Sequence, residues 1–233
     1  MPLFIKTMAE KEQAAIDVQE TIGKAERYFE ENKKSITIIG GAIVVLIGGY
    51  FAWTKLYIAP MEEQAQQDIY IAQNYFEKDS LDKAINGDGT NKGFKKIIED
   101  YGLTETGSLA HMYLGLCYLH KGQFEDAVSE LQEYDGDDMM LKPMSIGAQG
   151  DALCELGKAD DAIGEYLKAA DADKNNFTSP YYLMKAATLY ESLGKYKEAL
   201  QIYEQLKTDF FESREGRDAE KYISLAKAKA GIE

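Results

Sequence analysis

The sequence predicts an all-α protein in which one N-terminal transmembrane helix precedes an α-solenoid of about four helix pairs and a C-terminal capping helix. Three observations lead to this fold class. An uncharged stretch of 20 residues runs from Ser35 to Thr54. A pattern of glycine followed five residues later by alanine occurs three times at similar intervals, with an aromatic residue two after the glycine in two of the copies. Apolar residues also recur at helical spacing on both sides of each copy.

The uncharged stretch predicts a membrane anchor over residues 35–58. At about 1.5 Å per residue it reaches about 30 Å, which is the hydrocarbon thickness of a bilayer. A cleaved signal peptide is the alternative. However, 34 residues precede the stretch, and Tyr57-Ile58-Ala59-Pro60 is a poor cleavage site. We therefore expect the anchor to be retained.

Positive charges predict which side of the membrane each flank faces. Short flanks rich in Lys and Arg stay in the cytoplasm. After the stretch only Lys55 appears before Lys78, whereas Lys24, Arg27, Lys33 and Lys34 lie shortly before it. We expect residues 1–34 to be cytoplasmic and residues 59–233 to lie outside. In a bacterium this makes a single-pass inner-membrane protein with a periplasmic repeat domain.

Overall composition limits the classes of partner. The net charge of −14 and the lack of a basic stripe exclude nucleic acid, because phosphate contacts need clustered Lys and Arg. Membrane lipid is an expected partner because of the anchor. Cys117 and Cys154 are too few for a disulfide framework. They are either buried thiols, which we favour, or one bridge.

The repeat is centred on a glycine with alanine five residues later. Its copies are Gly122 with Ala127, Gly157 with Ala162, and Gly194 with Ala199. The glycines are 35 and 37 residues apart. A small residue stands seven before each glycine and larger residues stand four before and nine after it, as antiparallel helix pairs require. The small residues are Gly115, Gly150 and Ala187, and those nine after are Leu131, Tyr166 and Tyr203.

Over residues 108–212 this pattern resembles the tetratricopeptide repeat superfamily, whose period is about 34 residues. The resemblance implies a protein-binding groove lined by the first helix of each unit. Carried over residue by residue, the client-binding groove comprises Leu109, Met112, Leu116, Leu119, Met144, Gly147, Asp151, Cys154, Tyr181, Met184, Thr188 and Glu191. The alternative is that a neighbouring helix at Met61 to Phe76 covers part of this apolar lining.

The flanking segments complete the solenoid. Ala65, Ile69, Ala72 and Phe76 predict one amphipathic helix, and Phe94 to Tyr101 predicts another. We interpret them as a degenerate first unit whose helices are joined by a mobile loop over residues 81–91. Residues 217–230 are expected to form the capping helix.

No feature predicts catalysis. The loop at Asn86, Asp88 and Thr90 resembles an EF-hand, but Ile97 stands where a glutamate ligand is needed. His111 and His120 face nearly opposite sides of one helix and cannot share a metal. We therefore expect no catalytic residue, no metal and no cofactor, and predict that the protein is not an enzyme.

The order of parts resembles the ancillary SecYEG translocon subunit family, the YfgM-like single-span tetratricopeptide proteins. The glutamine-rich start after the span, residues 62–67, and the run Gly93-Phe94 to Tyr101 contribute to the resemblance. It implies a place beside the protein-conducting channel. The implied partners are SecYEG subunits, secreted or membrane client proteins, and periplasmic chaperones.

Two smaller features are candidates for docking. Gly41, Gly48 and Ala52 share one face of the span, and small residues permit close helix contact. Glycine is also simply frequent in membrane helices, which is the alternative. Within residues 1–34 an apolar stripe predicts an amphipathic helix on the membrane surface or on a channel loop: Val18, Ile22, Ala25 and Phe29.

The leading hypothesis is a translocon accessory subunit. The alternative is an envelope scaffold that organises cell-division or outer-surface assembly complexes, for which self-association of the repeat domain would be the sign.

Overall fold

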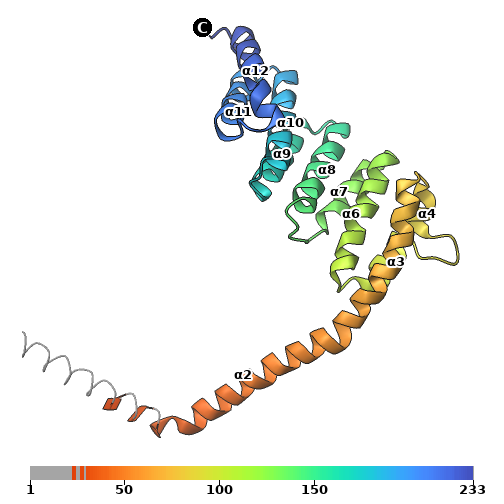
Figure 1. The fold of residues 1–233 in the computed structure, drawn as a ribbon, viewed down its shortest axis with the longest axis vertical. Helices are drawn as coiled ribbons and strands as arrows, with labels where there is room; N and C mark the ends of the chain where they lie inside the picture. Colours follow the sequence, from red (N-terminus) through yellow and green to blue (C-terminus); the bar gives the residue numbers. More distant parts are fainter. Residues whose placement is uncertain (1–22, 25–26, 29, 233) are drawn as a thin grey trace, which may run out of the picture. The chain divides into compact units, whose positions relative to one another are not determined.

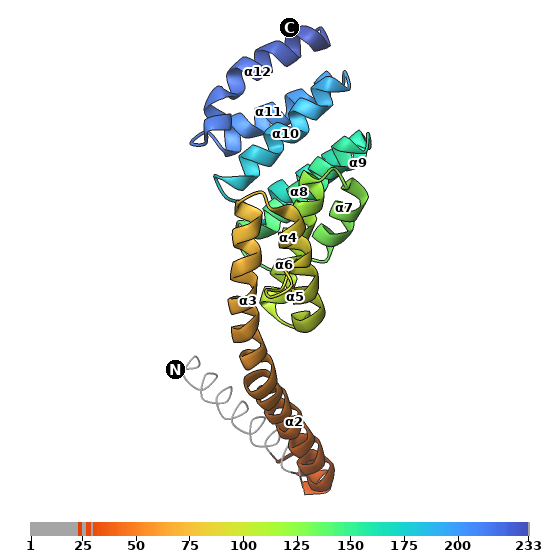
Figure 2. The ribbon, with the colours of Figure 1, turned by 90° about the vertical axis from the view of Figure 1, so that its right-hand side faces the viewer.

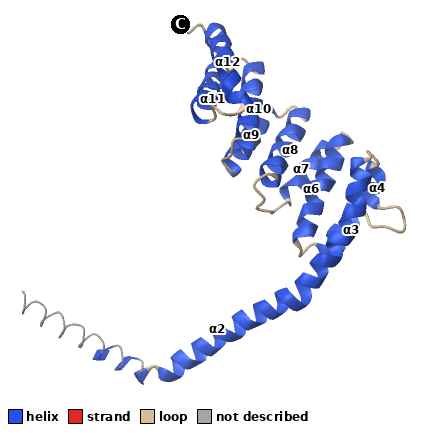
Figure 3. Cartoon of the chain, in the orientation of Figure 1, coloured by secondary structure: helices blue, strands red, loops and turns tan. Residues whose placement is uncertain are grey.

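The computed structural model describes residues 23–24, 27–28 and 30–232. Within this part of the chain the regular structure is helical throughout, with no strand (Figure 3). The chain divides into two compact units, one up to Tyr57 and one from Ile58 onward. The predicted N-terminal amphipathic stripe at Val18, Ile22, Ala25 and Phe29 lies outside the described residues.

The first unit contains helix α2, Lys33–Trp53, which is followed by a π-helical turn, Thr54–Ile58. None of the α2 side chains is buried within the structure. The helix is long and apolar enough to cross a membrane, a property that it would share with a signal sequence near an N-terminus. Gly41, Gly48 and Ala52 are all exposed.

The second unit is an all-α solenoid of antiparallel helix pairs (Figure 1). The degenerate first pair consists of α3, Ala59–Glu77, and α5, Phe94–Tyr101. Three regular pairs and the cap follow: α6, Glu105–His120; α7, Phe124–Gln132; α8, Leu141–Glu155; α9, Ala159–Ala172; α10, Thr178–Ser192; α11, Tyr196–Asp209; and α12, Arg214–Ala230.

The first two regular pairs each pack a glycine of the first helix against a large residue of the second. A Cβ on Gly115 of α6 would lie 2.6 Å from Cγ of Leu131 on α7. A Cβ on Gly150 of α8 would lie 2.7 Å from a ring carbon of Tyr166 on α9. These approaches are too close for any side chain on the first helix. The alternation of small and large residues predicted from the sequence is therefore confirmed.

The three glycine turns between paired helices have one geometry. Gly122, Gly157 and Gly194 have φ of 72°, 72° and 73°. The residue after each glycine donates its N–H to the carbonyl five residues earlier, as Gln123 does to Tyr118 at 2.9 Å. This is the Schellman arrangement, whose left-handed position glycine occupies without a steric penalty.

The first pair departs from the prediction of a mobile loop over residues 81–91. Residues Leu81–Asn86 form a short helix, α4, and only the residues after it form a loop. The physical reason is burial: Ala84 and Ile85 are 0% and 3% exposed and join the core formed by α3, α5 and α6. Figure 2 shows α4 beside α3 in this part of the solenoid. The Gly and Asp content of the segment concealed these buried apolar positions.

The capping helix α12 begins three residues earlier than predicted, at Arg214. The side-chain oxygen of Ser213 accepts a hydrogen bond from the Gly216 N–H at 2.9 Å and so caps the helix. One face buries Ala219, Ile223 and Ala226 against the last pair, while Leu225 is exposed. This cap covers the end of the core as terminal repeats do.

Ala199 on α11 offers a direct test of pair packing, because it is 0% exposed. We expect Ala199→Leu to lower the free energy of unfolding by about 1–3 kcal/mol through overpacking. Thermal or urea unfolding of the full chain in detergent, followed by circular dichroism at the helical band, measures this. Ala228→Leu on the exposed face of α12 is the matched control and should change stability little. Equal stability of the two variants would contradict the packing.

Candidate protein-interaction groove

The first helices α6, α8 and α10 carry all the predicted groove residues, but these differ in exposure. Met144 and Tyr181 are 42% and 48% exposed, and Thr188 is also exposed. Met112 and Gly147 are buried. The remainder are half-buried: Leu109, Leu116, Leu119, Asp151, Cys154, Met184 and Glu191.

Met112 and Gly147 belong to the core rather than to an open groove. Met112 is 3% exposed and lies in a cluster with Leu131 and Ala148. A Cβ on Gly147 would lie 2.0 Å from a ring carbon of Tyr182, so the α10 ring covers it. The family positions are therefore not equally available to a partner, because the next unit packs over these two.

Helix α3 also covers part of the lining. It packs against α6, and its buried residues share a core cluster to which half-buried Leu109 and Leu119 attach. The sequence analysis gave as an alternative that a neighbouring helix covers part of the apolar lining. This is the arrangement found at α6. The accessible remainder lies on α8 and α10, and we define Met144, Tyr181, Met184 and Thr188 as the α8–α10 strip.

A polar cluster borders the α8–α10 strip. The Tyr166 hydroxyl of α9 donates to Oδ1 of Asp151 on α8 at 2.6 Å, and Lys185 of α10 forms an ion pair with the same carboxylate. The Lys185 ammonium also lies 5.5 Å from the centre of the Tyr181 ring. Burial, and then the hydrogen bond to Asp151, raise the pKa of Tyr166 far above its usual value. Its phenol stays protonated and serves as a structural donor.

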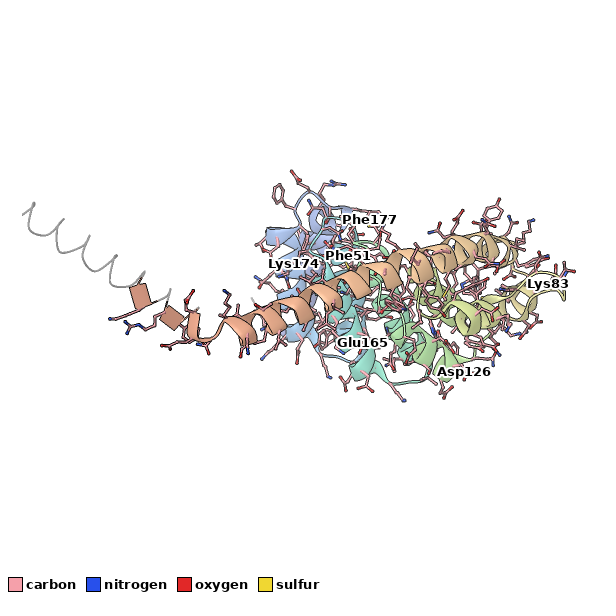
Figure 4. The ribbon with its side chains drawn as sticks, turned by 90° about the horizontal axis from the view of Figure 1, so that it is seen from below. Phe51, Lys83, Asp126, Glu165, Lys174 and Phe177 are labelled. Carbon is pink, nitrogen blue, oxygen red and sulfur yellow. The ribbon has the colours of Figure 1, made fainter. Side chains whose placement is uncertain are left out.

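Large apolar residues are also exposed in the connections between units, which the sequence analysis did not identify. Leu103, Met139, Phe177 and Phe211 are 65%, 53%, 71% and 64% exposed. Each stands in the link that enters a first helix or the cap, and Figure 4 labels Phe177 among the side chains of the second unit. A periodic signal was present, since the four recur at intervals near the repeat length.

Hydrogen bonds at two junctions were likewise missed. The Thr104 hydroxyl oxygen accepts a hydrogen bond from the Gly107 N–H, and the Ser213 hydroxyl oxygen accepts one from the Gly216 N–H. Each hydroxyl also donates to the backbone carbonyl of an aromatic residue three positions earlier, Tyr101 or Phe210. Glu62 of α3 accepts from the hydroxyl and the N–H of Thr106 at 2.6 and 3.1 Å. These two hydrogen bonds connect α3 to α6. The shared signal is an aromatic residue, then Ser or Thr after three, then Gly after three more.

The histidines and cysteines considered as chemical groups in the sequence analysis pack within and between helices. His111 Nδ1 lies 2.8 Å from Oε2 of Glu130, and the His120 ring lies 5.6 Å from that of Phe76. Among the described residues no group of three His, Cys, Asp or Glu is arranged to hold a metal. Cys117 is buried and Cys154 is half-buried, and both are free thiols. The histidine contacts connect neighbouring helices.

Comparison with known proteins supports the repeat assignment. Residues 101–138 and 148–214 match a tetratricopeptide repeat family model. The crystal structure of nearly identical TPR-like repeats from a Podosopora anserina protein, described as a kinesin light chain, superposes with a TM-score of 0.53 at 15% identity. That match covers 72% of this chain and 87% of the other. The fold is a tetratricopeptide-type solenoid.

A curated relative of the tetratricopeptide segment is human Superkiller complex protein 3, which is 30% identical over 129 residues. The match covers 53% of this chain but only 8% of the human protein. The shared feature is thus the repeat, and repeats of this kind form surfaces for protein–protein interaction.

The Glu62 contact predicts a pH dependence of stability. Burial opposes ionisation, but hydrogen bonds, chiefly from Thr106, hold the pKa of Glu62 below its ordinary 4.5. A lowered pKa in the folded state stabilises the fold above pH 4.5, and this contribution is lost as pH falls through the lowered pKa. We expect Glu62→Gln to lower the free energy of unfolding at pH 7. Below pH 4.5 the free energy of unfolding of the variant should approach that of the wild type.

Urea unfolding at both pH values measures this difference. Glu63→Gln, at an exposed neighbouring position, is the control and should follow wild type at both. A Glu62→Gln deficit that is equally large at pH 7 and pH 3.5 would contradict the electrostatic origin.

The two thiols should react at different rates. Burial raises the pKa of the Cys117 thiol to about 12, and thiolate is the reactive form. We expect iodoacetamide at pH 8 to modify half-buried Cys154 first and Cys117 slowly, with mass spectrometry as the readout. Both should react at similar rates in urea. Equal rates in the folded protein would contradict the burial of Cys117.

Proposed function

We propose that this chain is an accessory subunit of the SecYEG protein translocon in the bacterial inner membrane. In this proposal residues 1–34 are cytoplasmic, residues 35–58 cross the membrane and residues 59–233 are periplasmic. The solenoid contacts emerging secreted or membrane proteins, with periplasmic chaperones as further partners. The resemblance of the part order to that family motivates the proposal.

The observation that carries it is the combination of an exposed α8–α10 strip with an apolar helix, α2, none of whose residues is buried in the described part of the chain. Met144 and Tyr181 expose large apolar surface on a repeat fold suited to protein partners. Among the described residues helix α2 has no buried side chain, which accords with lipid or another membrane helix as its surroundings. Gly41, Gly48 and Ala52 are proposed as its contact face.

Photocrosslinking in native bacterial membranes tests the proposal. A photoreactive amino acid is placed at Gly48 in one strain and at Met144 in another, and the crosslinked proteins are identified by mass spectrometry. We expect SecYEG subunits from Gly48 and secreted proteins from Met144. Crosslinks only to division or surface-assembly components, or to a second copy of the chain, would replace the proposal by the envelope scaffold.

Substitutions in the α8–α10 strip should separate binding from folding. We expect Met144→Glu with Tyr181→Glu to reduce crosslinks to secreted proteins several-fold while helicity is unchanged, because both side chains are exposed. Leu225→Glu, at an exposed apolar position on α12, is the control and should retain them. Met112→Glu should instead unfold the solenoid, since it places a charge in the core. Unchanged crosslinking by the double variant would exclude the strip.

A further inference from the structure

A cleft of about 700 Å³ lies between α3, α6 and the connection from α7 to α8. Its apolar surface comes from all three elements. Ile69 belongs to α3 and Leu109 to α6, while Tyr134 and Leu141 border the connection. Tyr70 of α3 also lines the cleft and is 65% exposed. The cleft therefore offers apolar contact area that solvent can reach.

The polar rim of this cleft is strongly acidic. None of its lining residues is Lys or Arg. Five carry carboxylates: Glu62, Glu105, Asp135, Asp137 and Asp138. Such a set of like charges beside apolar surface raises the local concentration of cations and favours a cationic partner.

Three of these carboxylates already have partners within the fold. Glu62 accepts from Thr106, and Asp137 forms an ion pair with Lys142 at 2.6 Å. Asp138 accepts from the backbone N–H groups of Met140 and Leu141 at 2.8 and 2.9 Å, at the start of α8. Two of the aspartates, Asp137 and Asp138, therefore stabilise the start of α8 and have a structural role.

Glu105 and Asp135 are different. Both are exposed, and among the described residues neither carboxylate takes part in a hydrogen bond or ion pair, although the Asp135 backbone N–H donates to Ser108 Oγ at 3.0 Å. They line the cleft from opposite elements, since Glu105 begins α6 and Asp135 lies in the connection. Two carboxylates thus remain available to a ligand beside the apolar surface.

The Tyr134 side chain lines the cleft together with these carboxylates. Its pKa is raised, first by burial and then by Asp138, Asp135 and Asp137 in turn. A cation near this half-buried ring would be stabilised by the neighbouring carboxylates and by the ring face.

We propose that this cleft binds an extended client segment in which Lys or Arg adjoins a bulky apolar residue. The cation pairs with Glu105 and Asp135, and the apolar side chain packs against Ile69, Leu109 and Tyr70. This assignment rests on the proposed function of the solenoid as a client-binding module. The solenoid would then have two binding sites, the α8–α10 strip and this charge-selective cleft.

The test uses the full chain in detergent and a short fluorescein-labelled peptide of alternating lysine and leucine, with anisotropy as the readout. Two matched peptides replace either every lysine by glutamate or every leucine by alanine. The cleft variant is Glu105→Gln with Asp135→Asn, which leaves the internal hydrogen bonds of the acidic rim intact. The control variant, Asp161→Asn with Glu204→Gln, removes the same charge from exposed positions on α9 and α11.

We expect the lysine–leucine peptide to bind more tightly than both matched peptides, with affinity falling as salt is raised. The cleft variant should weaken binding about tenfold, equivalent to about 1.4 kcal/mol, and the control variant should not. Equal losses in the two variants, or equal binding of the three peptides, would overturn the proposal.

Failure of this site is distinguishable from failure of the proposed function. If Met144→Glu with Tyr181→Glu abolishes peptide binding and the cleft variant does not, the α8–α10 strip stands and the cleft assignment is wrong. If the cleft variant alone weakens binding while crosslinks from Gly48 and Met144 do not reach translocon or secreted proteins, the cleft assignment stands and the translocon role is wrong.

Discussion

The close approach of paired helices is the constraint on which the rest of the solenoid depends. Gly115 admits Leu131, and Gly150 admits Tyr166, so each second helix lies directly on its first. Turns with a left-handed glycine fix the exit direction at the end of each first helix. With both conditions repeated, successive pairs stack in one sense and their first helices form one continuous face. The surfaces available to a partner are consequences of this packing.

The stacking also explains why the partner surface is uneven. Each first helix carries an apolar row, but neighbours cover that row to different extents. Helix α3 covers part of α6, and Tyr182 covers Gly147, whereas Met144 and Tyr181 remain exposed. The connection before α8 adds aspartates beside a half-buried tyrosine. One repeat architecture thus yields an apolar strip at α8 and α10 and an acidic, partly apolar cleft beside α6.

Most of the fold was predictable because its signal is local and repeated. The glycine positions, the small residues facing large ones and the three regular pairs followed from spacing alone. The sequence did not reveal α4, because Ala84 and Ile85 acquire their burial from distant helices. It misplaced Met112 for a similar reason: a helical apolar stripe does not show which neighbour covers it. The cleft was missed because Glu105 and Asp135 are separated in sequence by a complete helix pair and line one cleft only in the folded chain.

The ion pair between Asp151 and Lys185 joins α8 to α10, the first helices of consecutive units. The Tyr166 hydroxyl shares the same carboxylate, so three helices converge on one group. Among the described residues no salt bridge joins α6 to α8 in this way, and that contact is apolar, around Met112 and Ala148. The α8–α10 seam is therefore joined through one shared carboxylate, whereas the α6–α8 seam is joined by apolar packing alone among the contacts described above.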